Sequence, residues 1–559
     1  MMFLCEKEGY MRRITAVILS VIIAALLIPP MQAQALEPIS LLKIGLAYGD
    51  NAVPAAKLQN LSGEQAGYQI GFYDTNRKFY PLITTYESQI VVLKDKPIWL
   101  TSEDEYLDVK PSSHKYYIGA YHAQVDAKFS TYQDAMSLAA IFTQLGYQAF
   151  PAFIQGTFRL RVGEHLTYEK AQESVASLYA ATGLNFTVVG GSNTCYTVAV
   201  TGTDRILFEF DSYESPLAVL PFSTQTWFNK YKYNGGFEFR RVYGNDITVI
   251  NVVTMEQYIK GVIPYEVSPS WPLEAQKAQA ICAKCYACSN LGKHTAMGFD
   301  LCNSTDCQVY RGTNYATAVS NLAVDSVQGM YLTYNGEIAM TYYHSNSGGH
   351  TEDVENIWTR YVPYLRGVED IYLKDPEAYS ITVDLDTISE ILMVKNYTGQ
   401  RVIDYYVSRR SPAGNVMEVT FTQADGTPLK LTADKARSAI NSSNKGVYLP
   451  SHRYTITPSI GIYINKVLKN TGVSSLYAIG GDGSVKALPS THTMVKAITS
   501  TGVKTLNPSN LTYVINGTGS GHHVGMSQSG AYGMAKEGFS YDQILQFYYT
   551  GTQVVYYGY

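Results

Sequence analysis

Apolar and polar residues alternate in short runs near the start of the chain, which is the pattern of half-buried β-strands. Residues 41–110 contain such runs, among them LKIGLAYG and GYQIGFYD, with frequent turns between them. We predict a small β module over 41–112, in which no chemistry is visible. Further alternation over 237–253, around the turn pair Gly244-Asn245, predicts a β-hairpin.

A strand–helix–strand pattern occurs twice between residues 115 and 191. Both helices place small or apolar residues at i, i+3 and i+4, so each has one buried face. Two such halves predict a sheet with two helices on one face and the other face open. The predicted elements are a strand at 116–121, a helix at 132–146, strands at 149–155 and 157–163, a helix at 168–183 and a strand at 185–191.

A single carboxylate, Glu266, lies between Pro264 and Pro269 in a stretch with little charge. A helix is predicted to start at Pro272 and to end at Gly292, because proline suits a first turn and glycine a C-terminus. The free N–H groups of that helix would favour ionised Glu266, whereas apolar neighbours would favour its protonated form. The spacing leaves two readings open, a carboxyl poised for proton chemistry and an ordinary loop residue that caps the helix.

The composition narrows the possible functions. A chain of 559 residues is expected to hold three or four domains, and its 46% hydrophobic content is ample for their cores. The net charge of −4 argues against a nucleic-acid-binding protein, which would show a basic face. Tyrosine is frequent, with 47 residues against 19 phenylalanines. Most of these tyrosines are expected in strands, although tyrosine also suits wet, sugar-facing surfaces.

The N-terminus has the features of an export signal. Arg12 and Arg13 precede an apolar run over 14–28, and the small-residue sequence Ala-Gln-Ala ends at Ala35. The run is shorter than the roughly 20 residues of a stable membrane span, so we predict cleavage after Ala35. The alternative for 1–35 is a retained membrane anchor. Either way the protein is expected to be exported, and to be extracellular or associated with the cell wall.

Six cysteines follow this segment, too few to build a fold of this size on disulfides. Cys282, Cys285 and Cys288 are spaced i, i+3 and i+6 on the predicted helix. They are either a metal or redox cluster or buried thiols that act as small apolar groups, and we favour buried thiols. Cys302 and Cys307 lie four residues apart in a loop, where a disulfide is sensible for an exported protein.

Residues 115–191 resemble a SPOR domain. The resemblance rests on YIGA at 117–120, GYQAF at 146–150 and FRLRVG at 158–163. It implies a domain over 113–192 that binds peptidoglycan glycan strands stripped of their stem peptides. The alternative is a ferredoxin-like module with a structural role, because that fold hosts many functions.

Residues 230–559 resemble the SpoIID/LytB family. The matching segments are Pro264, Glu266, Trp271, EAQKAQA at 274–280, CNSTDCQVYRG at 302–312, YYHSNSGGHTEDVENIW at 342–358 and GSGHHVGMSQSGAYGMAKEG at 519–538. SpoIID is a lytic transglycosylase, and the resemblance implies that Glu266 is its catalytic acid. A sporulation role, or one in cell-wall remodelling, is implied as well.

One carboxyl group is enough for this reaction. Ordinary glycosidases need two carboxylates, because one of them activates water or attacks the sugar. A protonated Glu266 would donate to the oxygen between MurNAc and GlcNAc, and would then take a proton from the C6 hydroxyl of MurNAc. The product is a 1,6-anhydro sugar, and no metal is required. We therefore expect no obligatory cofactor.

Two polar, glycine-containing segments are predicted to bind the sugar, following the family resemblance. The alternative is that they form tight turns in a β core, where glycine has a structural role. His523 stands where the family commonly has glycine. The predicted substrate-binding residues are Tyr343, His344, Ser345 and Ser347 in the first segment and His522, His523, Ser527 and Gln528 in the second.

Members of the family carry zinc at the loop that holds Cys302 and Cys307. A structural zinc usually has four ligands, and His294 is the nearest additional candidate in the sequence. The residue before Cys307 is often histidine in the family but is Asp306 here, so the ligand set is left open. Zinc at Cys302, Cys307 and His294 is expected to be structural if it binds, and a Cys302–Cys307 disulfide is the alternative.

The sequence therefore predicts a multidomain α+β protein, with a SPOR-type βαβ repeat domain and a β-rich SpoIID-type catalytic domain that has a few helices. We expect a lytic transglycosylase that cuts denuded glycan strands. The alternative is a non-enzymatic amidase enhancer that binds glycan, because LytB-type relatives are described as amidase modifiers. The expected partners are peptidoglycan glycan strands and a cell-wall amidase, and no nucleic acid.

Overall fold

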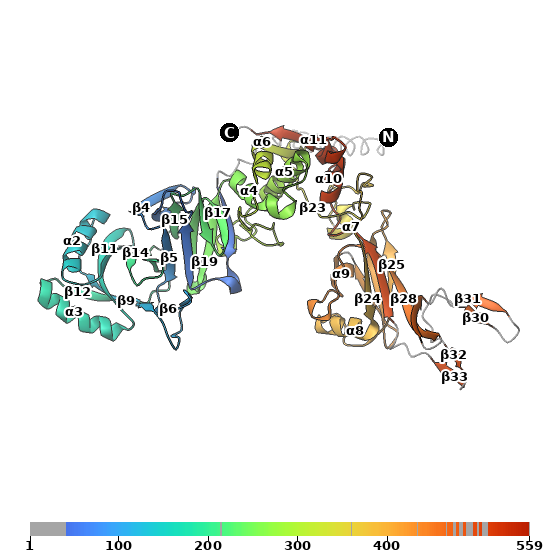
Figure 1. Cartoon of the computed structure of the whole chain (residues 1–559), viewed down its shortest axis with the longest axis horizontal. Helices are drawn as coiled ribbons and strands as arrows, with labels where there is room; N and C mark the ends of the chain where they lie inside the picture. Colours follow the sequence, from blue (N-terminus) through green and yellow to red (C-terminus); the bar gives the residue numbers. More distant parts are fainter. Residues whose placement is uncertain are drawn as a thin grey trace, which may run out of the picture.

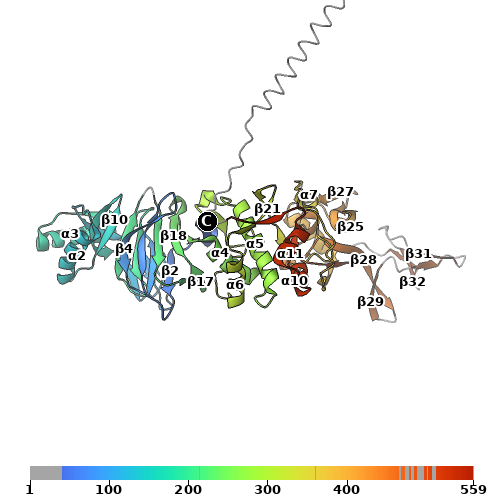
Figure 2. The ribbon, with the colours of Figure 1, turned by 90° about the horizontal axis from the view of Figure 1, so that it is seen from above.

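The computed structural model describes residues 41–212, 215–358, 360–432, 434–464, 467–472, 477–479, 484–487, 496–499, 502–505 and 512–557. The predicted leader or anchor at 1–35 lies outside these residues. Over the part of the chain that is described, no helix is both long enough and apolar enough to cross a membrane. Strands and helices are combined in several sheets along an elongated molecule, so the predicted multidomain α+β class is confirmed (Figures 1 and 2).

Two large sheets form the end of the molecule that is blue and cyan in Figure 1. The first has the order β20 (Leu301–Cys302), β1 (Leu42–Ala47), β19 (Ile247–Val253), β18 (Gly236–Arg241), β15 (Leu217–Pro221), β3 (Tyr68–Tyr73) and β4 (Phe79–Thr85). The second has the order β12 (Phe186–Gly190), β9 (Tyr121–Val125), β11 (Thr157–His165), β10 (Ala149–Ile154), β14 (Ile206–Asp211), β13 (Tyr196–Val200), β5 (Gln89–Lys94), β2 (Ala55–Asn60), β16 (Gln225–Phe228) and β17 (Tyr231–Asn234).

The predicted module at 41–112 does not form a sheet of its own. Strand β1 pairs with β19, β3 with β15 and β5 with β13, so its strands interleave with those of 196–253. The physical reason is burial: β5 and β19 are buried almost throughout, and such strands need partners on both edges. The hairpin predicted over 237–253 is confirmed, with β18 and β19 paired across a short 3₁₀ turn at Val242–Gly244.

The repeat region forms both predicted helices, α2 (Tyr132–Gln144) and α3 (Tyr168–Thr182). Each begins where a threonine side chain accepts a hydrogen bond from a backbone N–H of the first turn. The first strand, however, is β9 rather than 116–121. The chain turns at Gly119, where a Cβ would come within 2.4 Å of the His165 backbone, and β8 (Tyr116–Ile118) pairs with β6 (Ile98–Leu100) instead.

The face of the sheet opposite α2 and α3 is not open as predicted. A small sheet of β6, β7 (Tyr106–Leu107) and β8 is packed against it, and Ile98, Ile118 and Phe150 share one apolar cluster. The pattern of the two helices could not reveal this, because the covering strands come from an earlier part of the chain. Some polar positions of the outer strands remain exposed, among them Thr187 on β12.

Next to this cluster lies a buried group of charges on β9, β11 and β14. Glu209 accepts a hydrogen bond from Arg161, and its other oxygen lies 3.1 Å from His122 Nε2. Burial alone would raise the pKa of Glu209, but His122 and Arg161 hold it at about 2. Opposite charges in a dry interior attract strongly, so this group locks the repeat region to β14.

Arg161→Met tests how much the fold depends on this buried group. The substitution leaves Glu209 buried with only one cationic partner, and losing one partner of a buried pair costs about 3–5 kcal/mol of stability. We expect faster amide hydrogen exchange across β9, β11 and β14, read by mass spectrometry. Lys170→Ala, which breaks an exposed ion pair on α3, is the control and should leave exchange unchanged. Equal protection in the two variants would contradict the assignment.

The central part of the molecule is helical, and α5 lies at its middle (Figure 1). Strand β21 (Met330–Tyr334) pairs there with β36 (Gln553–Tyr556), so segments far apart in the sequence meet. Its core is continuous with that of the N-terminal sheets, because Leu42, Ile281 and Ile544 belong to one apolar cluster. The helices are α4 (Met255–Glu266), α5 (Leu273–Ser289), α6 (Ala318–Ser326), α7 (Val354–Trp358), α10 (Gln528–Lys536) and α11 (Tyr541–Tyr548).

A third part, at the orange end of Figure 1, has an apolar core of its own. It lies between the two halves of the helical part in the sequence. It contains β24 (Ala378–Asp384), α8 (Leu385–Val394), β25 (Val402–Arg410), β26 (Val416–Gln423), β27 (Pro428–Thr432), α9 (Asp434–Ser438), β28 (Arg453–Ile464), β29 (Val467–Gly472) and β34 (Thr512–Thr518). The boundaries predicted for the domains at 113–192 and 230–559 stay predictions.

Candidate functional site

Glu266 is the last residue of α4 and does not lie in a free loop. The helix begins with a capping box between Thr254 and Gln257, and Pro264 lies inside its last turn. A proline near the end of a helix removes only one backbone hydrogen bond, so Pro264 is accommodated in α4. The predicted helix that follows is confirmed, with Pro272 just before α5. Glu266 therefore lies at the C-terminal, negative end of a helix dipole, which disfavours its charged form.

Three uncharged groups surround the Glu266 carboxyl group. The Val309 backbone N–H donates to Oε1 at 3.4 Å, and Gln528 Nε2 donates to Oε2 at 3.5 Å. The Tyr343 side chain is the third hydrogen-bond partner. The side chain of Glu266 is partly exposed, so a substrate can reach it. This carboxyl is held in place by groups that do not neutralise its charge.

Burial raises the pKa of Glu266, against the smaller opposing effects of the hydrogen bonds from Val309, Gln528 and Tyr343. Burial also raises the pKa of Tyr343 well above its usual value, and the nearby Glu266 adds to this, so the phenol stays a neutral donor. A carboxyl group whose pKa is raised toward neutrality can act as a general acid.

A short parallel pairing brings the two predicted sugar-binding segments to Glu266. Strand β23 (Tyr343–His344) pairs with β35 (Met526–Ser527), with Tyr343 opposite Met526 and His344 opposite Ser527. Ser527 then caps α10, since its side chain accepts a hydrogen bond from the Gly530 N–H. Gln528, the first residue of α10, is thereby directed at the carboxyl group.

Three residues that support the site were not among the predicted site residues. Tyr343 donates to Gln308 Oε1 at 2.8 Å, and Gln308 Nε2 donates to the Tyr258 hydroxyl at 3.2 Å. Gln528 Nε2 also lies 3.4 Å from Gln279 Oε1. Gln279 and Gln308 are buried amides, and their place inside apolar segments was the sequence signal that could have identified them. The third, Val309, contributes only its backbone N–H, which no side-chain pattern reveals.

Several predicted binding residues are engaged in structural contacts. His344 is buried, its Nδ1 lies 3.2 Å from the Val524 carbonyl, and burial lowers its pKa to about 3. Ser347 is buried and donates to Asp370 Oδ2 at 2.6 Å. Ser345 is exposed at the surface. The structure thus brings Tyr343 and Gln528 to Glu266, whereas His344 and Ser347 hold the segment in place.

The two adjacent histidines differ in position. His522 is partly exposed, and its ring centre lies 4.8 Å from that of Trp358. His523 is fully buried, with Nδ1 3.4 Å from Asn415 Oδ1 in the third part of the molecule. Its φ of 65° is in the left-handed region that favours glycine, the residue that the family resemblance leads one to expect at this position. The His523 side chain is therefore directed away from Glu266.

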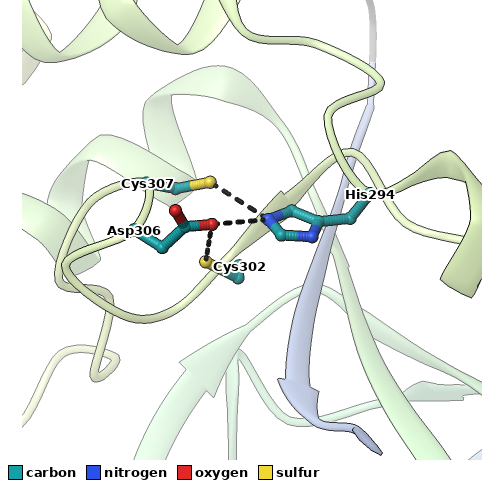
Figure 3. Close-up of side chains that lie close together, drawn as sticks. All are labelled: His294, Cys302, Asp306 and Cys307. Carbon is teal, nitrogen blue, oxygen red and sulfur yellow. Dashed lines mark hydrogen bonds and ion pairs between the residues drawn. The ribbon is translucent and has the colours of Figure 1, made fainter. Parts of the chain in front are cut away.

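His294, Cys302, Asp306 and Cys307, which follow α5 in the sequence, form one cluster (Figure 3). His294 Nε2 lies 3.4 Å from Cys307 Sγ and 3.3 Å from Asp306 Oδ2, which is 3.9 Å from Cys302 Sγ. Zinc bonds of 2.0–2.3 Å place tetrahedral ligand atoms roughly 3.3–3.8 Å apart, so these four residues fit a zinc ion. The two cysteines are free thiols here. Asp306 was missing from the predicted ligand set, because only the fold brings it to His294.

The three cysteines of α5 are packed as small apolar groups, as expected. Cys282 and Cys285 are fully buried, and burial raises the pKa of Cys282 to about 12. Burial likewise raises the pKa of the partly buried Cys288 to about 11. Such thiols are poorly reactive, because the thiolate is the nucleophile and the metal ligand.

Comparison with known proteins gives the family. The model of the stage II sporulation protein SpoIID matches residues 243–334, which contain Glu266, Gln279 and Val309. An uncharacterized protein of Brachyspira hyodysenteriae is 30% identical over 337 residues, 60% of this chain and 76% of that protein. The chain belongs to the SpoIID family.

Two Bacillus subtilis proteins are similar to this SpoIID-family chain. The stage II sporulation protein D is 27% identical over 318 residues, 54% of this chain and 74% of that protein. The amidase enhancer is 32% identical over 307 residues, again 54% of this chain. This SpoIID-family chain spans only 40% of the amidase enhancer's length.

Glu266→Gln tests how much folding stability the SpoIID-family chain loses when the Glu266 carboxyl group is ionised. Because its pKa is raised on folding, the stability that depends on the protonated form is complete below the pKa of the unfolded chain. That stability is lost as the pH rises through the folded-state pKa. We expect the variant to melt at a higher temperature than the wild type at pH 8, and at the same temperature at pH 4.

The control for this experiment is Glu274→Gln, which removes an ion pair with Lys277 on α5. This variant should gain no stability at pH 8. A wild type as stable as Glu266→Gln at both pH values would show that the carboxyl of Glu266 is ordinary.

Proposed function

We propose that this SpoIID-family chain is a peptidoglycan lytic transglycosylase that cuts the MurNAc–GlcNAc bonds of denuded glycan strands. The observation that carries the proposal is the environment of Glu266, a partly exposed carboxyl with a raised pKa and only uncharged hydrogen-bond donors. The stage II sporulation name of its relatives supports a role in sporulation or another form of cell-wall remodelling.

In the proposed reaction Glu266 acts twice. Its protonated carboxyl donates to the glycosidic oxygen as the bond from that oxygen to C1 of MurNAc breaks. The carboxylate then takes the proton of the MurNAc C6 hydroxyl as O6 bonds to C1, which gives the 1,6-anhydro product. The donors from Val309 and Gln528 hold the carboxylate between the two steps.

The proposed zinc is structural and takes no part in the reaction. His294, Cys302, Asp306 and Cys307 would hold it at the start of the loop that continues to Gln308 and Val309. An ion at this point would order the two residues that contact Tyr343 and Glu266. Its effect on activity would thus be indirect, through the position of a backbone N–H.

The repeat region is proposed to bind glycan as a SPOR domain, in an exported, wall-associated protein. The order β12-β9-β11-β10 with both helices on one face supports this. Strands β6, β7 and β8 cover the inner part of the sheet face opposite α2 and α3, so the glycan would contact the outer strands of that face. The glycan would then be held near the catalytic part, which raises its local concentration.

A second candidate function is that of an amidase enhancer. It is favoured by the 32% identity to the Bacillus subtilis protein of that name. In this alternative the chain binds glycan strands and stimulates a separate cell-wall amidase, and Glu266 has no chemical role.

An assay of products on denuded glycan strands separates the two functions. We expect the purified protein to release anhydro-disaccharides, detected by mass spectrometry. Loss of the general acid in Glu266→Gln should lower the rate by about 10²–10⁴-fold. Glu274→Gln is the matched control, since Glu274 lies on α5 and pairs with Lys277, and should retain activity. A wild type without anhydro products, together with equal stimulation of an amidase by wild type and Glu266→Gln, would favour the enhancer.

Metal analysis tests the zinc proposal. We expect about one zinc per purified chain, and a loss of this zinc in Asp306→Ala and in Cys302→Ser, because each removes one of four ligands. Cys288→Ser, on α5 and outside the cluster, is the control and should keep its zinc. A metal-free wild type whose mass is lower by two hydrogens would establish the disulfide instead.

A further inference from the structure

A cavity of 1080 Å³ opens where the N-terminal sheets meet the loop that contains Val309. Its walls come from β2, from the β16–β17 hairpin and from residues 303–311. Val309 lines this cavity, and its N–H contacts Glu266. The volume is at the upper end of ligand pockets, which are about 300–1,000 Å³. Val309 therefore separates the cavity from the proposed acid.

Several contacts hold the β16–β17 hairpin, one wall of the cavity, against residues 312–314. The Lys232 N–H donates to Asn314 Oδ1 at 2.7 Å, and the Thr313 N–H donates to the Lys232 carbonyl at 2.8 Å. Asn314 Nδ2 also donates to the Lys230 carbonyl at 3.0 Å. At Gly312 a Cβ would come within 2.1 Å of the Lys232 carbonyl, so the two segments are as close as backbones can be. The hairpin is therefore a fixed part of the surroundings of Glu266.

The polar and aromatic side chains of the cavity suit a saccharide. Trp227 and Tyr231 are partly exposed aromatic residues, and Lys232 Nζ lies over the Trp227 ring at 5.7 Å from its centre. Gln59, Gln89 and Asn229 are exposed amides. Amides both donate and accept, as hydroxyl and N-acetyl groups require. A purely apolar ligand would leave these amides without partners.

The charge of the cavity indicates that its ligand carries negative charge. Lys57, Lys230 and Arg311 line it, and the acidic side chain there, Asp104, is paired with Lys115 at 2.9 Å. The cavity is thus cationic in a chain whose net charge is −4. A glycan strand without stem peptides carries a lactyl carboxylate on each MurNAc. Its mixture of N-acetyl groups, hydroxyls and carboxylates matches these walls.

We propose that this cavity is a binding subsite for the sugars next to the scissile bond, specific for N-acetylated saccharides that carry carboxylates. The proposal rests on the proposed function and extends it, because it makes the N-terminal sheets part of the active site. Trp227 and Tyr231 contact sugar rings, and Lys57 and Arg311 bind the carboxylates. Strands must then be long enough to reach from Glu266 to β16 for full affinity.

The test uses the full-length Glu266→Gln protein, which binds without turnover. Calorimetry gives its affinity for denuded glycan oligosaccharides and for N-acetylglucosamine oligomers of equal length. Trp227→Ala should weaken the binding of both about tenfold, whereas Lys57→Gln with Arg311→Gln should weaken only that of the carboxylate-bearing ligand, by about tenfold or more. Tyr243→Ala, a fully exposed tyrosine outside the cavity, is the control and should bind as the parent does.

Hydrogen exchange places the ligand, because the repeat region is also proposed to bind glycan. Bound oligosaccharide should slow exchange over 225–234 and 303–311 in the parent and not in the cavity variants. Unchanged affinity and exchange in these variants would overturn the subsite, even if the wild type makes anhydro products. Weakened binding together with a wild type that makes none would uphold the subsite and overturn the transglycosylase. The Lys57 and Arg311 variants change only exposed side chains, so their folding is not at risk.

Discussion

The parallel pairing of β23 with β35 is the constraint on which the candidate site depends. It sets Tyr343 beside Met526 and leaves Gln528 to begin α10, so both side chains reach the same carboxyl group. The third part of the molecule, β24 to β34, lies between these two strands in the sequence and has its own core. The pairing therefore closes a loop of more than 180 residues. Val524 and Met526, at one end of this loop, are part of the apolar core of the helical part. Such a closure costs little more entropy than a shorter one.

The candidate site also depends on a carboxyl group that has no cationic partner. An arginine or lysine beside Glu266 would hold the carboxyl ionised, as His122 and Arg161 do for Glu209 in the N-terminal part. Glu266 has amide and backbone donors and a neutral phenol instead, at the negative end of a helix. The same chain thus contains a fully buried carboxyl group whose pKa is lowered by cationic neighbours and a partly exposed one whose pKa is raised by burial.

Local signals were read correctly from the sequence, and long-range ones were not. Helices α2, α3 and α5 have apolar faces and clear ends, so their positions were predictable. The partners of β1 and β5 were not, because the pairing of Leu42 with Val253 and of Lys94 with Tyr196, far along the chain, leaves no periodic trace in either strand. Glu266 stays a prediction as a site residue, and its position at the end of a helix was not predicted because Pro264 lies inside that helix. Asp306 was visible as a residue, whereas its contact with His294 depends on how two turns fold against each other.

The separation of Glu266 from Gln528 by 262 residues has a consequence for synthesis. A ribosome releases the acid long before it releases the amide and the capping serine that complete its surroundings. Until then the carboxyl group lacks the Gln528 donor and is surrounded only by groups that were made earlier. The surroundings of Glu266 are therefore complete only after α10 has been made.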